Sequence, residues 1–98
     1  MRAGDNMTAK ISTRRPKIRL ATAHRLPRSP AGGGPVLETR SGRVRLNAMA
    51  ATILGLCDGT YTRAEIVTRV AGTGDPVLAA DVRAFLDAAR RSGWVVER

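Results

Sequence analysis

The chain has 98 residues, enough for one small domain, and 43% of them are hydrophobic although it contains one Trp, one Tyr and one Phe. Its core must therefore consist of aliphatic side chains, and an extended base-stacking surface is not expected. One cysteine and one histidine exclude an intrachain disulfide and leave too few ligands for an ordinary zinc site. Since no apolar run approaches the roughly 20 residues of a membrane span, we expect a cytoplasmic protein that does not contact a membrane.

The formal net charge of +9 is concentrated near the N-terminus. Residues 1–28 hold eight basic residues against Asp5, whereas residues 29–98 hold nine arginines against seven acids. Residues 1–17 are also polar and without apolar periodicity, which predicts a disordered basic tail followed by one folded domain over residues 18–98. Because the charge belongs mainly to the tail, a nucleic acid is not expected as the partner of the domain.

Short extended segments are predicted in the first half of the chain. Ile18 and Leu20 fit one short strand, and the glycines of residues 32–34 fit a flexible loop. Residues 36–46 fit a β-hairpin with a tight turn at Ser41-Gly42.

The second strand of that hairpin alternates Val44 and Leu46 with Arg43 and Arg45. Successive side chains of a strand point to opposite faces, so the aliphatic pair is expected to be buried and the arginines to face water. Arginines on an edge strand favour either capture of an extended peptide or protection against unwanted pairing. The residues alone leave both interpretations open.

Three helices follow, each with a start signal in the sequence. The first begins after Asn47 and runs to about Cys57, the second begins with the Thr62-x-x-Glu65 capping box and stops near Gly72, and the third runs from Asp75-Pro76 to Gly93. The residues after Gly93 are expected to fold back onto the core. This order predicts a winged-helix-like α+β fold with three short antiparallel strands followed by three helices.

No residues have the pattern of a catalytic site. The sequence offers no nucleophile with a positioned base, no paired carboxylates and no phosphate-binding loop. His24 is expected to be solvated or packed, and Cys57, an apolar helical position beside Asp58, is expected to pack in the core. We therefore predict a protein that is not an enzyme and binds neither metal nor cofactor.

Residues 44–67 combine four features. These are a strand ending in Leu46-Asn47, a helix with Ala51-x-Ile53-Leu54, the turn Cys57-Asp58-Gly59 and the start Thr62-x-x-Glu65-Ile66. Later, Asp81-Val82-x-x-Phe85-Leu86 is followed by Gly93-Trp94-Val95. Together these features resemble the PqqD family, the pyrroloquinoline quinone biosynthesis proteins D, over residues 18–98.

This resemblance implies a non-catalytic domain that binds the leader of a ribosomally made precursor peptide and presents it to a radical S-adenosylmethionine enzyme. It also implies that the leader adds a strand beside the third strand and lies against the last helix. The arginines of this chain beside the added strand would then form ion pairs with acidic residues of the leader. The site residues implied are Arg43, Val44, Arg45 and Leu46 on the strand and Arg83, Asp87 and Arg90 on the helix.

Residues 34–42, Gly-Pro-Val-Leu-Glu-Thr-Arg-Ser-Gly, are more polar than the second strand and Pro-Glu-Gly turn of the family. Because of this difference, the sequence does not indicate which precursor peptide, or which peptide-modification pathway, the domain serves. One alternative function is a winged-helix DNA-binding protein, although the second helix offers only Arg63 and Arg69 with Glu65 between them. Another is a structural subunit that holds an enzyme and ignores peptides.

Overall fold

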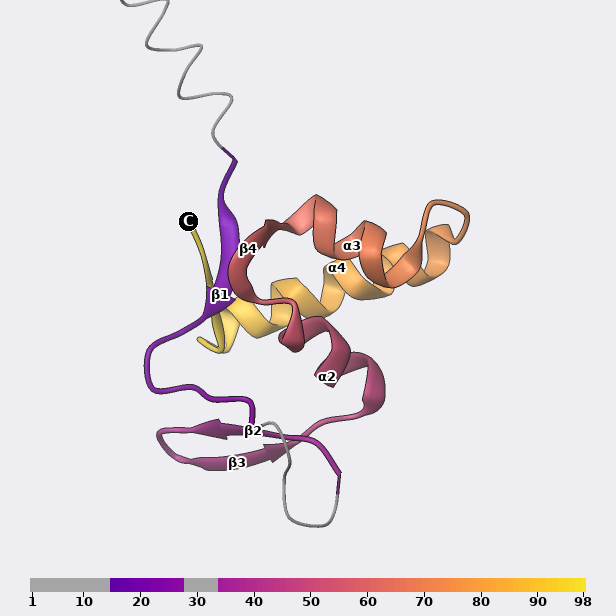
Figure 1. Ribbon diagram of the computed structural model, residues 1–98. Helices are drawn as coiled ribbons and strands as arrows, with labels where there is room; N and C mark the ends of the chain where they lie inside the picture. The colour runs from indigo at the N-terminus through magenta and orange to yellow at the C-terminus, as the bar shows by residue number, and fades with distance from the viewer. Residues whose placement is uncertain (1–14, 28–33) are drawn as a thin grey trace, which may run out of the picture.

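The computed structural model describes residues 15–27 and 34–98. In chain order, the elements are β1 (Lys17–Leu20), β2 (Val36–Thr39), β3 (Gly42–Arg45), α2 (Ala48–Gly55), β4 (Asp58–Thr62), α3 (Arg63–Ala71), α4 (Pro76–Arg91) and β5 (Val95–Glu97). The helices α3 and α4 pack side by side, while the β2–β3 hairpin lies at the other end of the domain beyond α2 (Figure 1). Within these two ranges, the predicted α+β class, with short antiparallel strands and three helices, is confirmed. The predicted tail over residues 1–17 lies largely outside the described residues, so the domain boundary stays a prediction.

The strands form two sheets, which the sequence does not indicate. One sheet has the order β4-β1-β5, and the other is the β2–β3 hairpin. The sequence predicted neither β4 nor β5 as a strand and did not indicate how β1 is paired. Both missed strands are short, and β4, with the sequence Asp-Gly-Thr-Tyr-Thr, lacks the apolar alternation that identifies a half-buried strand. Their backbone groups are paired through contacts with β1, far away in sequence.

The hairpin has the predicted position, and its turn lies one residue earlier than predicted. Arg40 and Ser41 form the turn between Thr39 and Gly42, and Gly42 has a φ of 142°, which a side chain would disfavour. The predicted alternation in β3 is confirmed, because Val44 packs against the core cluster while Arg43 is exposed.

One continuous core joins the sheets and helices. Its fully buried side chains are Ile18, Leu37, Ile53, Leu54, Ile66, Val82 and Leu86. Leu37 attaches the hairpin to this core, and the Phe85 and Trp94 rings, with centroids 6.5 Å apart, cover part of it. The hairpin and the helices are therefore joined by a mainly aliphatic core. Across the described ranges, no helix is long and apolar enough to cross a bilayer.

The predicted helix starts are confirmed by their hydrogen bonds. The side chain of Asn47 accepts from the amide of Ala50 at 2.7 Å, and that of Asp75 accepts from the amide of Leu78 at 2.9 Å. Each bond satisfies an amide that has no partner within its helix.

At the start of α3, the predicted capping box is complete. The Glu65 amide donates to the Thr62 hydroxyl at 3.2 Å, and the Thr62 amide donates to the Glu65 carboxylate at 2.8 Å. The second bond is the main reason why the pKa of Glu65 is lowered. This cap fixes the point at which β4 becomes α3.

Thr62→Ala is expected to destabilise the domain by about 1 kcal/mol, because an amide at the start of α3 loses its partner. The thermal midpoint should fall by roughly 4–8 °C for a domain of this size. Thr68→Ala, at an exposed position in the same helix, is the control and should leave the midpoint nearly unchanged. Equal shifts in both variants would contradict the role of the cap.

Candidate functional site

Among the strands that the structure describes, β3 is the free edge of the hairpin sheet. Arg25 and Glu38 form an isolated bridge in which each amide donates to the other's carbonyl, at 2.8 and 2.7 Å. The backbone groups of Glu38 therefore point away from β3. The amide of Leu46 donates to the carbonyl of Pro35 at 3.0 Å, on the side of β2. Since backbone groups alternate along an antiparallel pair, Gly42 and Val44 bond to β2.

The same alternation directs the backbone N–H and C=O groups of Arg43 and Arg45 outward. No hydrogen bond from another described segment reaches them. Edge strands with unpaired groups of this kind are templates for an added strand. Residues 43–46, which the resemblance implies as the strand part of the site, thus form an edge with two sets of available backbone groups.

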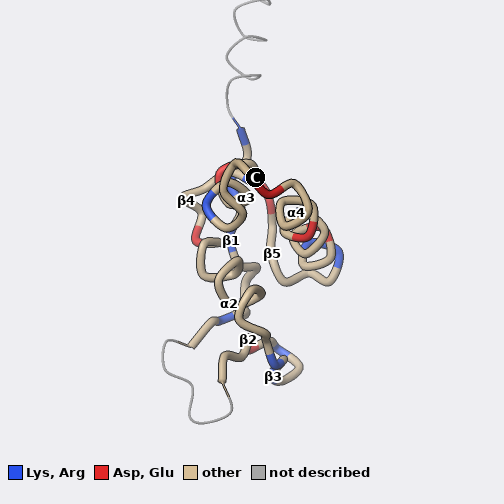
Figure 2. Tube along the Cα trace, turned by 90° about the vertical axis from the view of Figure 1, so that its right-hand side faces the viewer, with Lys and Arg blue, Asp and Glu red and all other residues tan. Residues whose placement is uncertain are grey.

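The side chains beside this edge carry positive charge. Arg43 is 73% exposed, and its guanidinium lies 3.6 Å from the Glu38 carboxylate on the neighbouring strand. Directly opposed residues share a sheet face, so Arg25, Glu38 and Arg43 form a row across the sheet, with Arg45 on the same face. The ribbon view (Figure 1) and the tube view (Figure 2) both place this charged hairpin at one end of the domain, away from α3.

The implied helix residues lie in a different environment. Arg63 at the start of α3 donates to Glu97 of β5 at 3.1 Å and lies 2.9 Å from the carboxylate of Asp87. Arg90 lies 3.5 Å from the same Glu97 carboxylate. The hydrogen bond to Glu97 is the main reason why the pKa of Arg63 is raised. Asp87 and Arg90 thus belong to an ion-pair network that ties α3, α4 and β5 together.

The strand and helix parts of the implied site are not brought into one cleft. Figures 1 and 2 show α2 between the hairpin and the α3–α4 pair. Arg83 is exposed on α4, and within residues 15–27 and 34–98 it forms no ion pair. Residues 43–46, on β3 and directly after it, therefore lie apart from the three implied residues of α4, which contribute to a separate charged surface.

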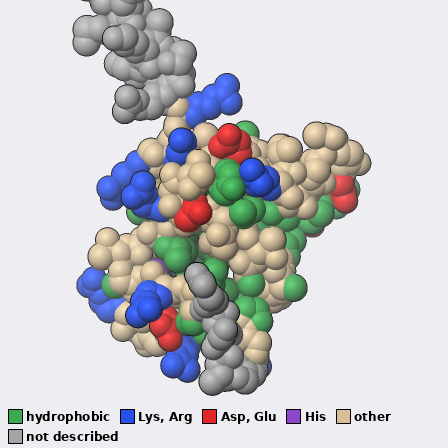
Figure 3. Space-filling view, in the orientation of Figure 1, with side chains coloured by type: hydrophobic (Ala, Val, Ile, Leu, Met, Phe, Trp, Pro, Cys, Tyr) green, Lys and Arg blue, Asp and Glu red, His purple; other side chains and the backbone are tan. Residues whose placement is uncertain are grey.

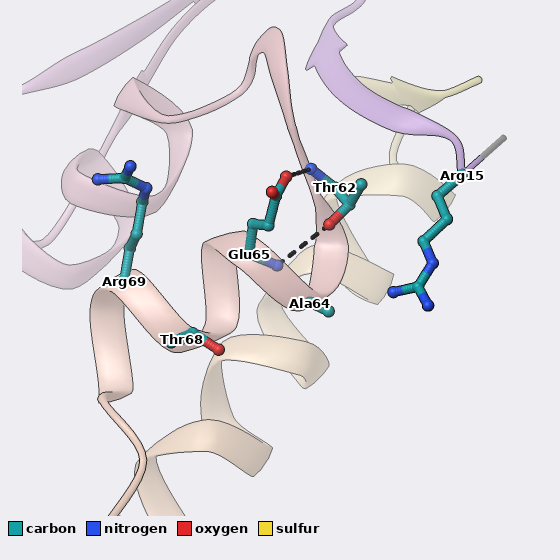
Figure 4. A pocket seen from close by; sticks show the side chains of 6 residues that line it. All are labelled: Arg15, Thr62, Ala64, Glu65, Thr68 and Arg69. Atoms are coloured by element: carbon teal, nitrogen blue, oxygen red, sulfur yellow. Dashed lines mark hydrogen bonds between the residues drawn. The ribbon is translucent and has the colours of Figure 1, made fainter. Parts of the chain in front are cut away.

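Two hollows lie elsewhere on the domain, and sequence reasoning indicated neither. One, of about 440 Å³, surrounds the capping box, with Arg15 and Arg69 on opposite sides of it (Figure 4). Thr62 and Glu65 already satisfy each other there. The other, of about 420 Å³, is lined by Arg19, Leu20, Leu26, Leu54, Gly55, Cys57 and Asp58. Both are open, and neither includes a residue of the β3 edge.

Cys57 is a structural residue, as predicted. Its thiol is buried and donates to the Ile53 carbonyl at 3.3 Å. Burial, and secondarily the neighbouring Asp58 carboxylate, raises the pKa of the Cys57 thiol to about 12. At neutral pH the group is therefore a protonated, unreactive thiol. The residues described by the structure contain no cluster of three or more metal-ligating side chains.

An unpaired edge strand flanked by arginines is a feature of domains that bind extended peptides by strand addition, and also of edges that are protected against unwanted pairing. The sequence profile described as "Coenzyme PQQ synthesis protein D (PqqD)" matches residues 35–95. That match covers more than half of the chain, which belongs to the PqqD family. The resemblance noted in the sequence is confirmed.

Curated relatives agree with this assignment. PqqA binding protein 2 of Pseudomonas putida is 36% identical over 84 residues, which cover 84% of this chain and 93% of that protein. PqqA binding protein 1 of the same organism is 35% identical over 75 residues, covering 74% of this chain and 82% of that protein. No solved structure gives a significant match.

Proposed function

We propose that this protein binds the precursor peptide of pyrroloquinoline quinone biosynthesis, without catalysing a reaction itself, and presents it to a radical S-adenosylmethionine enzyme. The observation that carries the proposal is the free edge of β3, whose outward backbone groups belong to Arg43 and Arg45. It is supported by membership of the PqqD family and by the names of the relatives as PqqA binding proteins.

Binding proceeds by strand addition. The leader of the precursor lies beside β3 and exchanges main-chain hydrogen bonds with Arg43 and Arg45. Carboxylates of the leader pair with the two guanidinium groups, which are free to move because both side chains are exposed. The leader is thereby held in an extended conformation, which the enzyme can engage.

Residues of α4 have a secondary role in this proposal. A leader longer than β3 would extend past the strand and reach the charged surface of Arg83, Asp87 and Arg90. Asp87 and Arg90 already have ion-pair partners within the domain. Their replacement is therefore expected to change the affinity for the leader less than replacement of Arg43 and Arg45.

The first test is calorimetric titration of the full chain with the precursor peptide, followed by the double variant Arg43→Ala/Arg45→Ala. We expect saturable one-to-one binding that weakens at least about tenfold in the double variant, since two charge-assisted contacts are lost. Arg40→Ala, which removes one positive charge from the turn of the same hairpin, is the control and should change the affinity little. No heat from a folded protein would contradict the proposal.

The contacts of the two arginines on α3 speak against the alternative function, DNA binding. Of the two arginines on α3, Arg63 is engaged by Glu97 and Asp87, and Arg69 lies with its guanidinium carbon 4.3 Å from the centre of the Tyr61 ring. Neither is free to contact base edges without breaking those interactions. Tight duplex binding that weakens steeply with salt would favour this alternative. An enzyme complex whose affinity is unchanged by the precursor would favour the structural-subunit role.

A further inference from the structure

The free edge of β3 presents backbone and side chains in a fixed alternation, and this alternation constrains the peptide that can pair with it. Residues of an added antiparallel strand that lie opposite Arg43 and Arg45 would exchange main-chain hydrogen bonds with them. These two peptide residues are separated by one residue, which lies opposite Val44. Three consecutive peptide positions are thus defined by the register.

The two sheet faces differ in chemistry at these positions. Directly opposed side chains share a face, so the two outer peptide residues would lie beside Arg43 and Arg45 on the solvent side. The middle residue would lie beside Val44 on the side that packs against the core, where Leu37 and Leu46 also lie. An apolar side chain there would cover the half-buried Val44, whereas a charged one would lose solvent contact.

The charge of the strand region favours acidic outer residues. Residues 15–57 contain eight basic residues and one acid, Glu38, whereas residues 58–98 contain six of each. In the space-filling view, basic side chains lie in separate groups, one around the hairpin and another beside β1 (Figure 3). Half of these eight basic residues, Arg25, Arg40, Arg43 and Arg45, lie in or beside the hairpin, where Glu38 is the one acid, so the free edge lies in a positively charged part of the domain.

Glu38 shows how a carboxylate is held on this face. It lies between Arg25 and Arg43 in the row across the sheet, and its carboxylate is 3.6 Å from the Arg43 guanidinium. This single contact, with Arg43 73% exposed, leaves the other donors of the guanidinium available. Arg45, on the same face, has no ion pair among the described residues. Both guanidinium groups therefore have donors available for carboxylates of the added strand.

We infer that the peptide segment bound at β3 contains two acidic residues separated by one apolar residue, with the carboxylates on Arg43 and Arg45 and the apolar side chain on Val44. This inference rests on the proposed function and adds the chemical pattern that the edge selects. A strand with the opposite alternation would place its acids against the core face and its apolar side chain against the arginines.

The test is a scan of the precursor peptide against the full-length protein. Each Asp is changed to Asn, and each Glu to Gln, one at a time, and the dissociation constants are measured by titration. We expect two positions, two residues apart, at which the affinity falls about tenfold each, and less than about twofold changes elsewhere. Replacing the apolar residue between them by Asp should cost at least as much.

A charge reversal identifies the peptide residue that pairs with Arg45. Arg45→Glu should abolish detectable binding of the native precursor, and a precursor with Lys at one of the two acidic positions should restore it. Binding of the native precursor with no acidic pair at this spacing, or with no position sensitive to the scan, would overturn this inference and leave the proposed function intact. Failure of the unmodified precursor to bind would overturn both.

Discussion

Arg45→Pro is expected to lower the affinity for the precursor peptide by at least about a hundredfold while the domain stays folded. The outward amide of Arg45 would be a donor to the added strand, and proline removes that donor. Its ring also projects into the space that the peptide backbone would occupy, which is how prolines protect edge strands. The lost backbone hydrogen bond and the steric clash of the proline ring with the peptide backbone together cost about 3 kcal/mol of binding free energy.

The hairpin should tolerate this substitution. The amide of Arg45 takes no part in the β2–β3 ladder, and Val44 before it already has the extended conformation that precedes proline. Arg45→Ala is the matched control, because it removes the side chain and keeps the amide. If titration gave the two variants equal affinities, the added strand would not use the edge of β3. Circular dichroism checks that both are folded.

Leu86→Ala should destabilise the domain by about 2–5 kcal/mol. Leu86 is fully buried on α4, in a core that is built almost entirely from aliphatic side chains. A domain of this size has only about 5–15 kcal/mol of total stability, so the variant would be unfolded in part near physiological temperature. Urea unfolding followed by circular dichroism measures the effect.

Val77→Ala provides the comparison, since Val77 is a large apolar side chain on the same helix that is 72% exposed. Its replacement removes little buried surface and should change the free energy of unfolding by less than about 0.5 kcal/mol. A loss of stability at Val77 equal to that at Leu86 would show that α4 is covered by another chain in solution.

The sequence predicted those parts of the fold that depend on neighbouring residues. The caps at Asn47, Thr62 and Asp75 are short-range hydrogen bonds between residue types that strongly favour helix starts, and all three are present. The alternation of arginines and aliphatic residues in β3 was likewise sufficient to assign its two faces.

The sequence could not predict pairings between distant segments. Nothing local indicates that Ile18 would lie between β4 and β5, or that Arg25 would extend the hairpin sheet. For the site, the resemblance implied the strand residues 43–46, and the structure supplies their register. The ion-pair network of Asp87 and Arg90 involves Arg63 and Glu97, which are 34 residues apart in sequence, and side chains with this separation carry no periodic signal.

Amide hydrogen exchange with and without the precursor peptide tests the central claim most directly, because it measures the backbone groups of β3 themselves. On binding, the amides of Arg43 and Arg45 should be protected by about tenfold or more, while the amide of Val44, which already bonds to β2, should change less. Saturable binding that leaves the exchange of Arg43 and Arg45 unchanged would contradict strand addition at this edge.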